Sequence, residues 1–302
     1  MLKGKDQMTE THGFGGNWTE EKLKRVEKYL KAYATIMNKQ NFRFAYIDAF
    51  AGTGYRKEKK NKIDNQIFLF QQNDIKEIET YSKGSARIAL EIKPEFDKYI
   101  FIEKSRKNFT ELLKLKEEFK DKEKKIDLIN ADANNWIIDR CNNYKWQNNR
   151  AVLFLDPYGM QVNWETIKAI ANTKAIDLWY LFPFGIGVNR LLKKDAGNMP
   201  ASWEAKLDSI LGTNEWKEAF YGERQETTLF GNETKTVKDA DFNKISKFIV
   251  KRLKSIFAGV DENPLLLRNS KNNPLYLLCF ASGSPRGAKT AIKIAQDILK
   301  RQ

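Results

Sequence analysis

The chain has 302 residues, of which 41% are hydrophobic and 30% are charged, and its formal net charge is +14. This length allows a sizeable core, and no apolar run reaches the ~20 residues that a membrane-spanning helix needs. With only two cysteines and one histidine, a disulfide scaffold and a cysteine- or histidine-based metal site are both disfavoured.

The positive charge has two interpretations of similar weight. It can reflect a lysine-rich surface of the kind that an AT-rich genome encodes. It can also attract a partner that carries phosphate groups, because a basic surface raises the local concentration of polyanions. The first residues lack the apolar stretch of a secretory signal, so we expect a cytoplasmic protein that does not associate with membranes.

The first predicted element is a helix over residues 18–38, with Thr19 placed to cap its start. Its apolar residues recur at helical spacing and predict one buried face. These residues are Leu23, Val26, Tyr29, Leu30 and Tyr33. We expect this helix to pack on a sheet.

A buried strand is predicted next, beginning at Phe44 and ending at Asp48, and a glycine turn follows it. The turn reads Gly52-Thr53-Gly54. Two glycines one residue apart allow the backbone to turn tightly and a ligand to approach without meeting a Cβ atom.

Four further strands with continuous apolar sequence are separated by helices or loops. They are predicted at residues 97–102, 125–130, 150–155 and 175–181. Such strands are typical of a parallel sheet that is covered on both faces. A closing strand pair (263–267 and 274–281) and a helix over 288–299 end the chain.

Residues 186–250 differ from this pattern, because they are polar and only locally helical. We interpret them as a helical insertion. The predicted fold class is therefore α/β, a mostly parallel doubly wound sheet with a helical insertion, in a single domain over residues 1–302.

Acidic residues follow four of the predicted strands in order: Asp48, Glu103, Asp132 and Asp156. In a doubly wound sheet, such side chains gather at one edge, and an acid after the second strand can accept both hydroxyls of a ribose. The dinucleotide fingerprint needs a third glycine, which is absent after Gly54. A ligand without a pyrophosphate therefore fits better.

Four motifs resemble, in order, those of class I S-adenosylmethionine-dependent methyltransferases. They are 48–54 (DAFAGTG), 101–104 (FIEK), 130–133 (NADA) and 156–159 (DPYG). More narrowly, the chain resembles the three-Cys-motif partner protein family (TcmP). The narrower match includes Trp18-Thr19-x-x-Lys22-Leu23, residues 153–162, 177–183, 256–260 and 269–272.

This resemblance implies a Rossmann-like class I methyltransferase fold, S-adenosylmethionine as cofactor and a separate partner protein with a three-cysteine motif. Gly52 and Gly54 would border the methionine part of the cofactor, Glu103 would hold its ribose, and Asp132 would lie beside its adenine. The implied cofactor-binding residues are Asp48, Phe50, Gly52, Gly54, Glu103, Lys104, Asp132, Ala133 and Asp156.

The same resemblance places Asp156, Pro157 and Tyr158 where the methyl group leaves, as the catalytic residues. Amino-methyltransferases that act on adenine have Asp/Asn-Pro-Pro-aromatic here; the acid or amide holds the target amine, and the aromatic ring stacks on the base. This chain departs from that motif, with Tyr158 in place of the second proline and Gly159 in place of the aromatic residue. Tyr158 either stacks on the base or belongs to a tight turn.

The predicted function is thus methyl transfer to an amino group of a base, adenine favoured, in DNA or RNA, without a metal ion. Two alternatives stay open. The chain could bind S-adenosylmethionine or a nucleotide without catalysis, as a subunit of the three-Cys-motif protein, or it could be a Mg²⁺-dependent nuclease.

Some aromatic residues also have two interpretations. Phe182 and Phe184 line the target pocket or the core, and Trp203 and Trp216 stack nucleobases or pack within the insertion.

Overall fold

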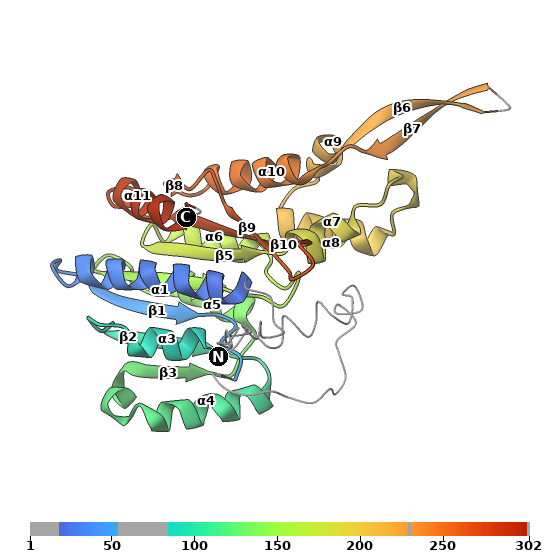
Figure 1. The fold of residues 1–302 in the computed structure, drawn as a ribbon. Helices are drawn as coiled ribbons and strands as arrows, with labels where there is room; N and C mark the ends of the chain where they lie inside the picture. The colour runs from blue at the N-terminus through green and yellow to red at the C-terminus, as the bar shows by residue number, and fades with distance from the viewer. Residues whose placement is uncertain (1–17, 54–83, 229–230, 301–302) are drawn as a thin grey trace, which may run out of the picture.

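A computed structural model describes residues 18–53, 84–228 and 231–300, and its centre is an eight-stranded sheet with helices on both faces (Figure 1). The strand order is β3-β2-β1-β4-β5-β10-β8, and β9 also pairs with β10. The strands are β1 (Arg43–Asp48), β2 (Lys98–Ile102), β3 (Ile126–Ile129), β4 (Asn149–Leu155), β5 (Ile176–Phe182), β8 (Gly259–Val260), β9 (Leu265–Arg268) and β10 (Pro274–Ser282).

The parallel part of the sheet sets the position of the acidic residues. β1 lies between β2 and β4 and runs parallel to both, with Asp48 level with Phe101 and Phe154. Glu103 and Asp156 each follow two residues beyond those partners. The register therefore brings the ends of three strands to one edge of the sheet, which we call the carboxyl edge.

Beyond β5 the direction of the sheet reverses. β10 is antiparallel to β5, and β8 and β9 are both antiparallel to β10. The mostly parallel, doubly wound arrangement confirms the predicted α/β class and is a Rossmann-like fold. The predicted strands agree with the observed ones to within two residues at nearly every end.

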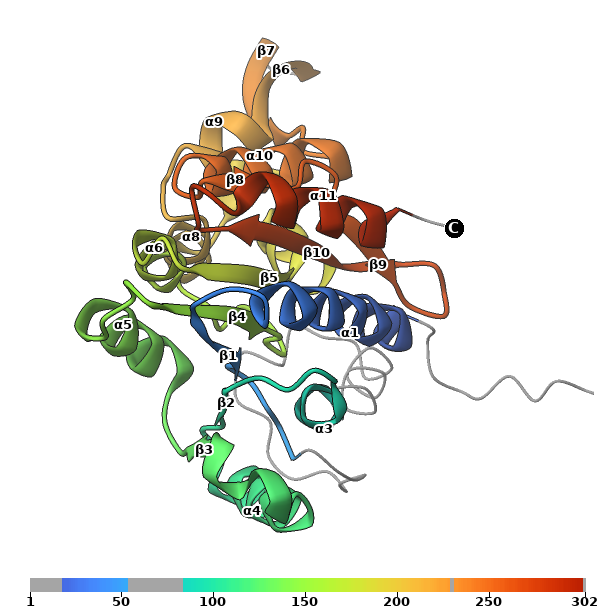
Figure 2. The same cartoon turned by 90° about the vertical axis from the view of Figure 1, so that its left-hand side faces the viewer.

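The helices form two layers, as Figure 2 shows for α1 and for the pair α5 and α6 on the opposite side of the sheet. One layer contains α1 (Trp18–Met37), α3 (Ser85–Glu91), α4 (Arg106–Glu118) and α11 (Ala288–Leu299). The other contains α5 (Ala133–Asn143), α6 (Trp164–Asn172), α8 (Ala201–Leu211) and α10 (Phe242–Lys254). Tyr46 packs with the first layer and Ile47 with the second, because successive strand residues point to opposite faces.

The insertion is helical only in part. It contains α7 (Asn189–Leu191), α8, α9 (Trp216–Phe220) and α10, but its middle is a β-hairpin of β6 (Tyr221–Thr228) and β7 (Gly231–Lys238). This hairpin projects from the body of the protein (Figure 1). Because it is polar along its length, it lacks the apolar alternation that identifies a strand in sequence.

The start of α1 also differs from the prediction. The helix begins at Trp18, so Thr19 lies inside its first turn, where it is fully buried and does not cap the helix. Among the described helices, none combines the length and apolar character needed to cross a membrane.

Candidate functional site

A cavity of about 470 Å³ opens at the carboxyl edge, over the ends of β1, β2 and β3. Its lining includes several of the residues predicted from sequence, together with side chains from α8 and from the segment after β4. The predicted residues among them are Phe50, Glu103, Lys104, Asp132, Ala133 and Tyr158. The cavity therefore brings together residues that are more than 100 positions apart in sequence.

Gly52 forms part of the turn that follows β1. Its φ angle is 62°, in the left-handed region that favours glycine, and its amide donates a hydrogen bond of 3.0 Å to Glu103 Oε2. The turn thus joins the end of β1 to the end of β2. Gly54, the second glycine predicted to contact a cofactor, lies outside the described residues.

Glu103 is 9% exposed and lies in the wall of the cavity. Besides the Gly52 amide, it accepts a 2.7 Å hydrogen bond from the Ser105 amide to Oε1. Burial raises the pKa of this carboxyl, and the backbone hydrogen bonds oppose that effect. The Asn108 side chain and the Lys104 amide also donate to this carboxylate, so donors from four residues surround it.

Asp132 is the N-cap of α5, with Oδ1 accepting hydrogen bonds from the amides of Asn134 (3.1 Å) and Asn135 (3.3 Å). Its Oδ2 lies 3.3 Å from Lys104 Nζ, in a solvent-exposed ion pair. Ala133 follows in the cavity wall. Asp132 therefore has a structural role in starting α5, in addition to its position at the cavity.

Asp156 follows β4 and forms a buried ion pair that the sequence did not predict. Lys22 Nζ of α1 lies 2.5 Å from Asp156 Oδ2, and the two side chains are 2% and 8% exposed. The ammonium also lies 5.4 Å from the ring centroid of Trp18 and 5.8 Å from that of Phe154. The sequence signal was a lysine within the apolar face of an amphipathic helix, because Lys22 shares that face with Val26 and Tyr29.

Asp48 is completely buried and does not line the cavity. It accepts hydrogen bonds from Tyr46 Oη and from the Phe50 amide, each at 3.3 Å, and from the Ser85 side chain. Burial raises the pKa of Asp48 to about 7, and the nearby charge of Asp156 contributes to the rise. Asp48 thus holds the turn that places Phe50 in the cavity wall.

Pro157 is buried, and the half-buried Tyr158 borders the cavity. The Tyr158 amide donates to Gln161 Oε1 at 3.1 Å, and its carbonyl accepts a bond from Tyr276 Oη at 3.4 Å. Tyr276 in turn stacks on Trp18, with ring centroids 5.3 Å apart. The segment after β4 is therefore held by the same end of α1 that supplies Lys22.

Other predicted aromatic residues have packing roles. Phe182 and Phe184 belong to the core, and neither lines the cavity. Trp216 is also buried, with Nε1 donating to Asp208 Oδ1 at 2.7 Å. Trp203 is partly buried, and Lys193 Nζ lies 4.6 Å from its ring centroid.

Lys206 of α8 is a cavity residue that sequence reasoning missed. Its side chain lines the cavity, and burial lowers its pKa. Nothing in the local sequence distinguishes it from other lysines of the insertion. In residues 18–53, 84–228 and 231–300, no group of three or more histidine, cysteine, aspartate or glutamate side chains is arranged to hold a metal ion.

No family model matches the chain, and no curated protein matches it. Among similar solved structures, a protein of the DUF519 family from Legionella pneumophila is 14% identical, with a TM-score of 0.47 over 95% of this chain and 92% of the other. A conserved hypothetical protein from Streptococcus pyogenes is 15% identical, with a TM-score of 0.30 over 68% of this chain and 94% of the other.

A candidate methyltransferase from Escherichia coli is 12% identical, with a TM-score of 0.28 over 71% of this chain and 87% of the other. All three structures are distant from this chain. The chemistry of the site therefore rests on its own residues.

Proposed function

We propose that the protein is an S-adenosylmethionine-dependent methyltransferase that methylates an amino group of a nucleobase, adenine favoured, in DNA or RNA. One observation carries this proposal: Asp156, at the end of β4, is oriented by the buried Lys22 ammonium and is followed by Tyr158 at the cavity. An acid fixed in this way can position a hydrogen-bond donor beside a bound cofactor.

The cavity has features that suit the cofactor. Its volume of about 470 Å³ lies within the usual range for small-molecule sites. Glu103 would accept hydroxyl groups of the ribose, and Asp132 and Ala133 would lie beside the adenine. Phe50 and Gly52 would border the methionine part, with Gly54 beyond them. The bound cofactor would supply a methyl group on a positively charged sulfur atom.

Asp156 would accept a hydrogen bond from the target amine. Oδ2 accepts from Lys22, and among the described residues Oδ1 accepts no hydrogen bond, so it has room for a donor. Lys22 is then a positioning residue, because it acts through Asp156. Pro157 restricts the backbone after Asp156, and the Tyr158 ring would stack on the base, which must be flipped out if it comes from a duplex.

The charge of the protein supports a nucleic acid as substrate. The net charge of +14 favours a polyanion, and Lys104 and Lys206 lie at the cavity itself. The resemblance to the TcmP family further supports the proposal that a separate three-Cys-motif protein is a partner. That resemblance rests on the sequence motifs alone.

A second candidate function is a cofactor- or nucleotide-binding subunit without catalysis of its own. The observation in its favour is that Lys22 already occupies one oxygen of Asp156, in a motif with one proline instead of two. In that case the ion pair would serve to hold α1 against the end of β4. The two candidates share the cofactor cavity and differ in the role of Asp156.

The test combines calorimetric titration with S-adenosylmethionine and a tritiated-methyl assay on DNA and RNA, with and without the partner protein. We expect Glu103→Ala to abolish cofactor binding, and Asp156→Ala to bind cofactor but transfer no methyl groups. The exposed Asp139 on α5 offers a matched control, and Asp139→Ala should retain both properties.

Two outcomes would separate the candidates. Full transfer by Asp156→Ala would contradict the catalytic assignment. Cofactor binding by the intact chain without transfer to any nucleic acid, alone or with the partner, would establish the binding subunit instead.

A further inference from the structure

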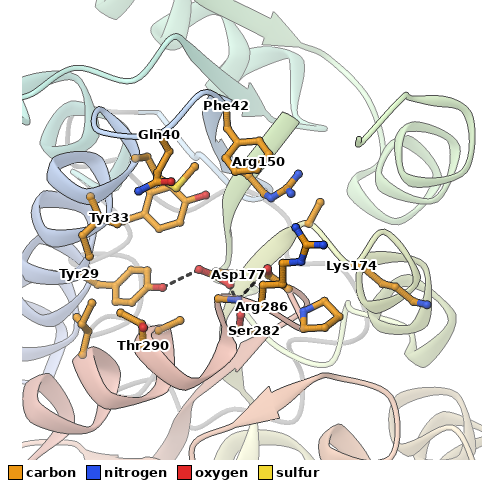
Figure 3. Close-up of a pocket in the computed structure, with 18 residues that line it drawn as sticks. Tyr29, Tyr33, Gln40, Phe42, Arg150, Lys174, Asp177, Ser282, Arg286 and Thr290 are labelled. Carbon is orange, nitrogen blue, oxygen red and sulfur yellow. Dashed lines mark hydrogen bonds between the residues drawn. The ribbon is translucent and has the colours of Figure 1, made fainter. Parts of the chain in front are cut away.

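A second cavity, of about 710 Å³, lies at the opposite edge of the sheet (Figure 3). It is bounded by α1, by the starts of β4 and β5, and by the connection from β10 to α11. Arg150, the second residue of β4, contributes to its wall, whereas Asp156 follows the other end of the same strand. At ~3.3 Å per residue, six residues of strand separate the two sites by about 20 Å.

Two guanidinium groups line this second cavity, those of Arg150 and Arg286. Arg150 Nη1 donates to the carbonyl oxygens of Trp146 (3.0 Å) and Asn149 (2.7 Å), and its guanidinium carbon lies 3.9 Å from the ring centroid of Phe42. Burial lowers the pKa of Arg150, the neighbouring Tyr33 and Asp177 raise it, and the charge of Arg286 has a smaller lowering effect. The two guanidinium groups therefore belong to one cavity and influence each other electrostatically.

The acid of the cavity does not neutralise them by direct contact. Asp177 accepts hydrogen bonds from Tyr29 Oη (2.8 Å) and Ser282 Oγ (2.5 Å), so both of its oxygens are engaged (Figure 3). In the part of the chain that the structure describes, neither Arg150 nor Arg286 forms an ion pair with a carboxylate. Among the described residues, Arg150 donates only through Nη1, so both guanidinium groups keep N–H donors for an anion from outside the chain.

The rest of the cavity is suited to a flat, mainly apolar body. Tyr33, Met37, Phe42, Pro285 and Ile294 contribute apolar or aromatic surface. The polar side chains of Gln40, Ser284 and Thr290 lie among them and offer hydrogen bonds. The volume is far larger than an inorganic anion requires, which favours an organic ligand with an anionic group.

We propose that this cavity binds a nucleoside monophosphate, with its phosphate between Arg150 and Arg286 and its base against the wall that contains Tyr33, Met37 and Ile294. A doubly charged phosphate matches two guanidinium groups, which favour such oxyanions through paired hydrogen bonds. The adjacent start of α11 has no acidic residue in its first turn, and its dipole adds to the attraction. This proposal does not depend on methyltransferase activity.

The test uses the full chain with Glu103→Ala, so that the cofactor cavity at the carboxyl edge is disabled. Calorimetric titration with adenosine 5′-monophosphate should give saturable binding to one site. Adenosine alone and inorganic phosphate alone should each bind at least roughly tenfold more weakly, because each keeps only part of the contacts.

Adding Arg286→Gln should weaken binding of the monophosphate by roughly tenfold, the loss expected for one charge-assisted contact. Arg286 is exposed and makes no hydrogen bond or ion pair among the described residues, so this variant should fold normally. Arg224→Gln removes the same charge from the exposed hairpin strand β6 and should leave binding unchanged.

Three binding results would each overturn the proposal: no saturable binding, equal affinity in the Arg286→Gln and Arg224→Gln variants, or phosphate binding as tightly as the nucleotide. Hydrogen exchange provides an independent check on location. The nucleotide should protect the backbone of residues 284–290, and protection only at residues 103–105 and 131–134 would place it in the other cavity and count against the proposal.

Discussion

The two edges of the sheet contain the same arrangement, a buried aspartate bound by a residue of α1, but the hydrogen-bond donors differ in charge. At each edge, a buried aspartate at the end or start of a strand receives a hydrogen bond from α1. At the carboxyl edge, Lys22 holds Asp156 with a charged group; at the opposite edge, Tyr29 holds Asp177 together with Ser282, and both donors are neutral hydroxyls.

A single helix, α1, supplies the hydrogen-bond donor at both edges. Lys22 and Tyr29 are seven residues apart, about two turns, so they share a face and are separated by roughly 10 Å along the axis. Hydroxyl donors only partly offset the cost of burying a charge, and burial accordingly raises the pKa of Asp177 to about 6. A cation instead attracts the carboxylate of Asp156 directly, which suits an acid whose orientation matters for binding.

The largest effect should come from removing the cation. Lys22→Met leaves the Asp156 carboxylate buried without its partner, which typically costs about 3–5 kcal/mol. We expect a loss of that size in the free energy of unfolding, measured with denaturant, and loss of methyl transfer. Adding Asp156→Asn to Lys22→Met should recover much of the stability, because the uncompensated charge is gone.

Lys24 provides the matched control on the same helix. Its ion pair with Glu20 is exposed, at 65% and 60%, so Lys24→Met should change the stability by no more than about 0.5 kcal/mol. Equal losses of unfolding free energy in the Lys22 and Lys24 variants would show that burial does not make the Lys22–Asp156 pair more important for stability than the exposed Lys24–Glu20 pair.

The next effect concerns pH. Asp48 and Asp177 have pKa values raised from 3.8 to about 7 and about 6. Between about pH 4 and 7, the unfolded chain releases protons that the folded chain still holds, so the free energy of unfolding falls as pH rises. Asp48→Asn should make the decrease in the free energy of unfolding between about pH 4 and 7 smaller, by at most about 4 kcal/mol.

Asp177→Asn should reduce the decrease in the free energy of unfolding mainly between about pH 4 and 6. This narrower pH range distinguishes Asp177 from Asp48, and so one edge from the other. Denaturant unfolding at a series of pH values measures both slopes. The exposed Asp139→Asn serves as the reference, and a slope in either buried variant that equals the reference slope would contradict the assignment.

A smaller effect is expected from the hydroxyl at the second edge. Tyr29→Phe leaves Asp177 with one donor fewer and should cost about 1–3 kcal/mol at neutral pH, without changing cofactor affinity. Tyr33 lies one turn further along α1, and its hydroxyl makes no hydrogen bond among the described residues, so Tyr33→Phe should be nearly neutral. Thermal unfolding of both variants measures the contrast.

The smallest loss of stability should come from the glycine turn, which belongs to the carboxyl edge alone. Gly52→Ala forces a side chain into a left-handed conformation at a cost of about 1–2 kcal/mol. It should also weaken cofactor binding, as calorimetry would show. Gly222→Ala on β6 meets its nearest atoms at ordinary contact distances and should leave cofactor affinity unaltered.

Much of the fold was predictable because its signals are local. Continuous apolar runs identified β1 to β5, and the helix predicted over residues 288–299 matches α11 at both ends. The hairpin of β6 and β7 was not predicted, because its polar strands pair with each other rather than with an apolar layer. Thr19 resembles a cap in sequence, but packing against the sheet extends α1 past it to Trp18.

The sequence by itself determined the succession of β1 to β5, the glycine turn after β1 and the acids that follow the strands. Those features follow from backbone preference, apolar periodicity and the geometry of parallel strands. Only the tertiary structure decided that Lys22 faces Asp156, that Asp48 is buried outside the cavity lining and that Arg150 and Arg286 line a second cavity. These pairings join residues up to 136 positions apart, and no local preference encodes which side chains long-range packing brings together.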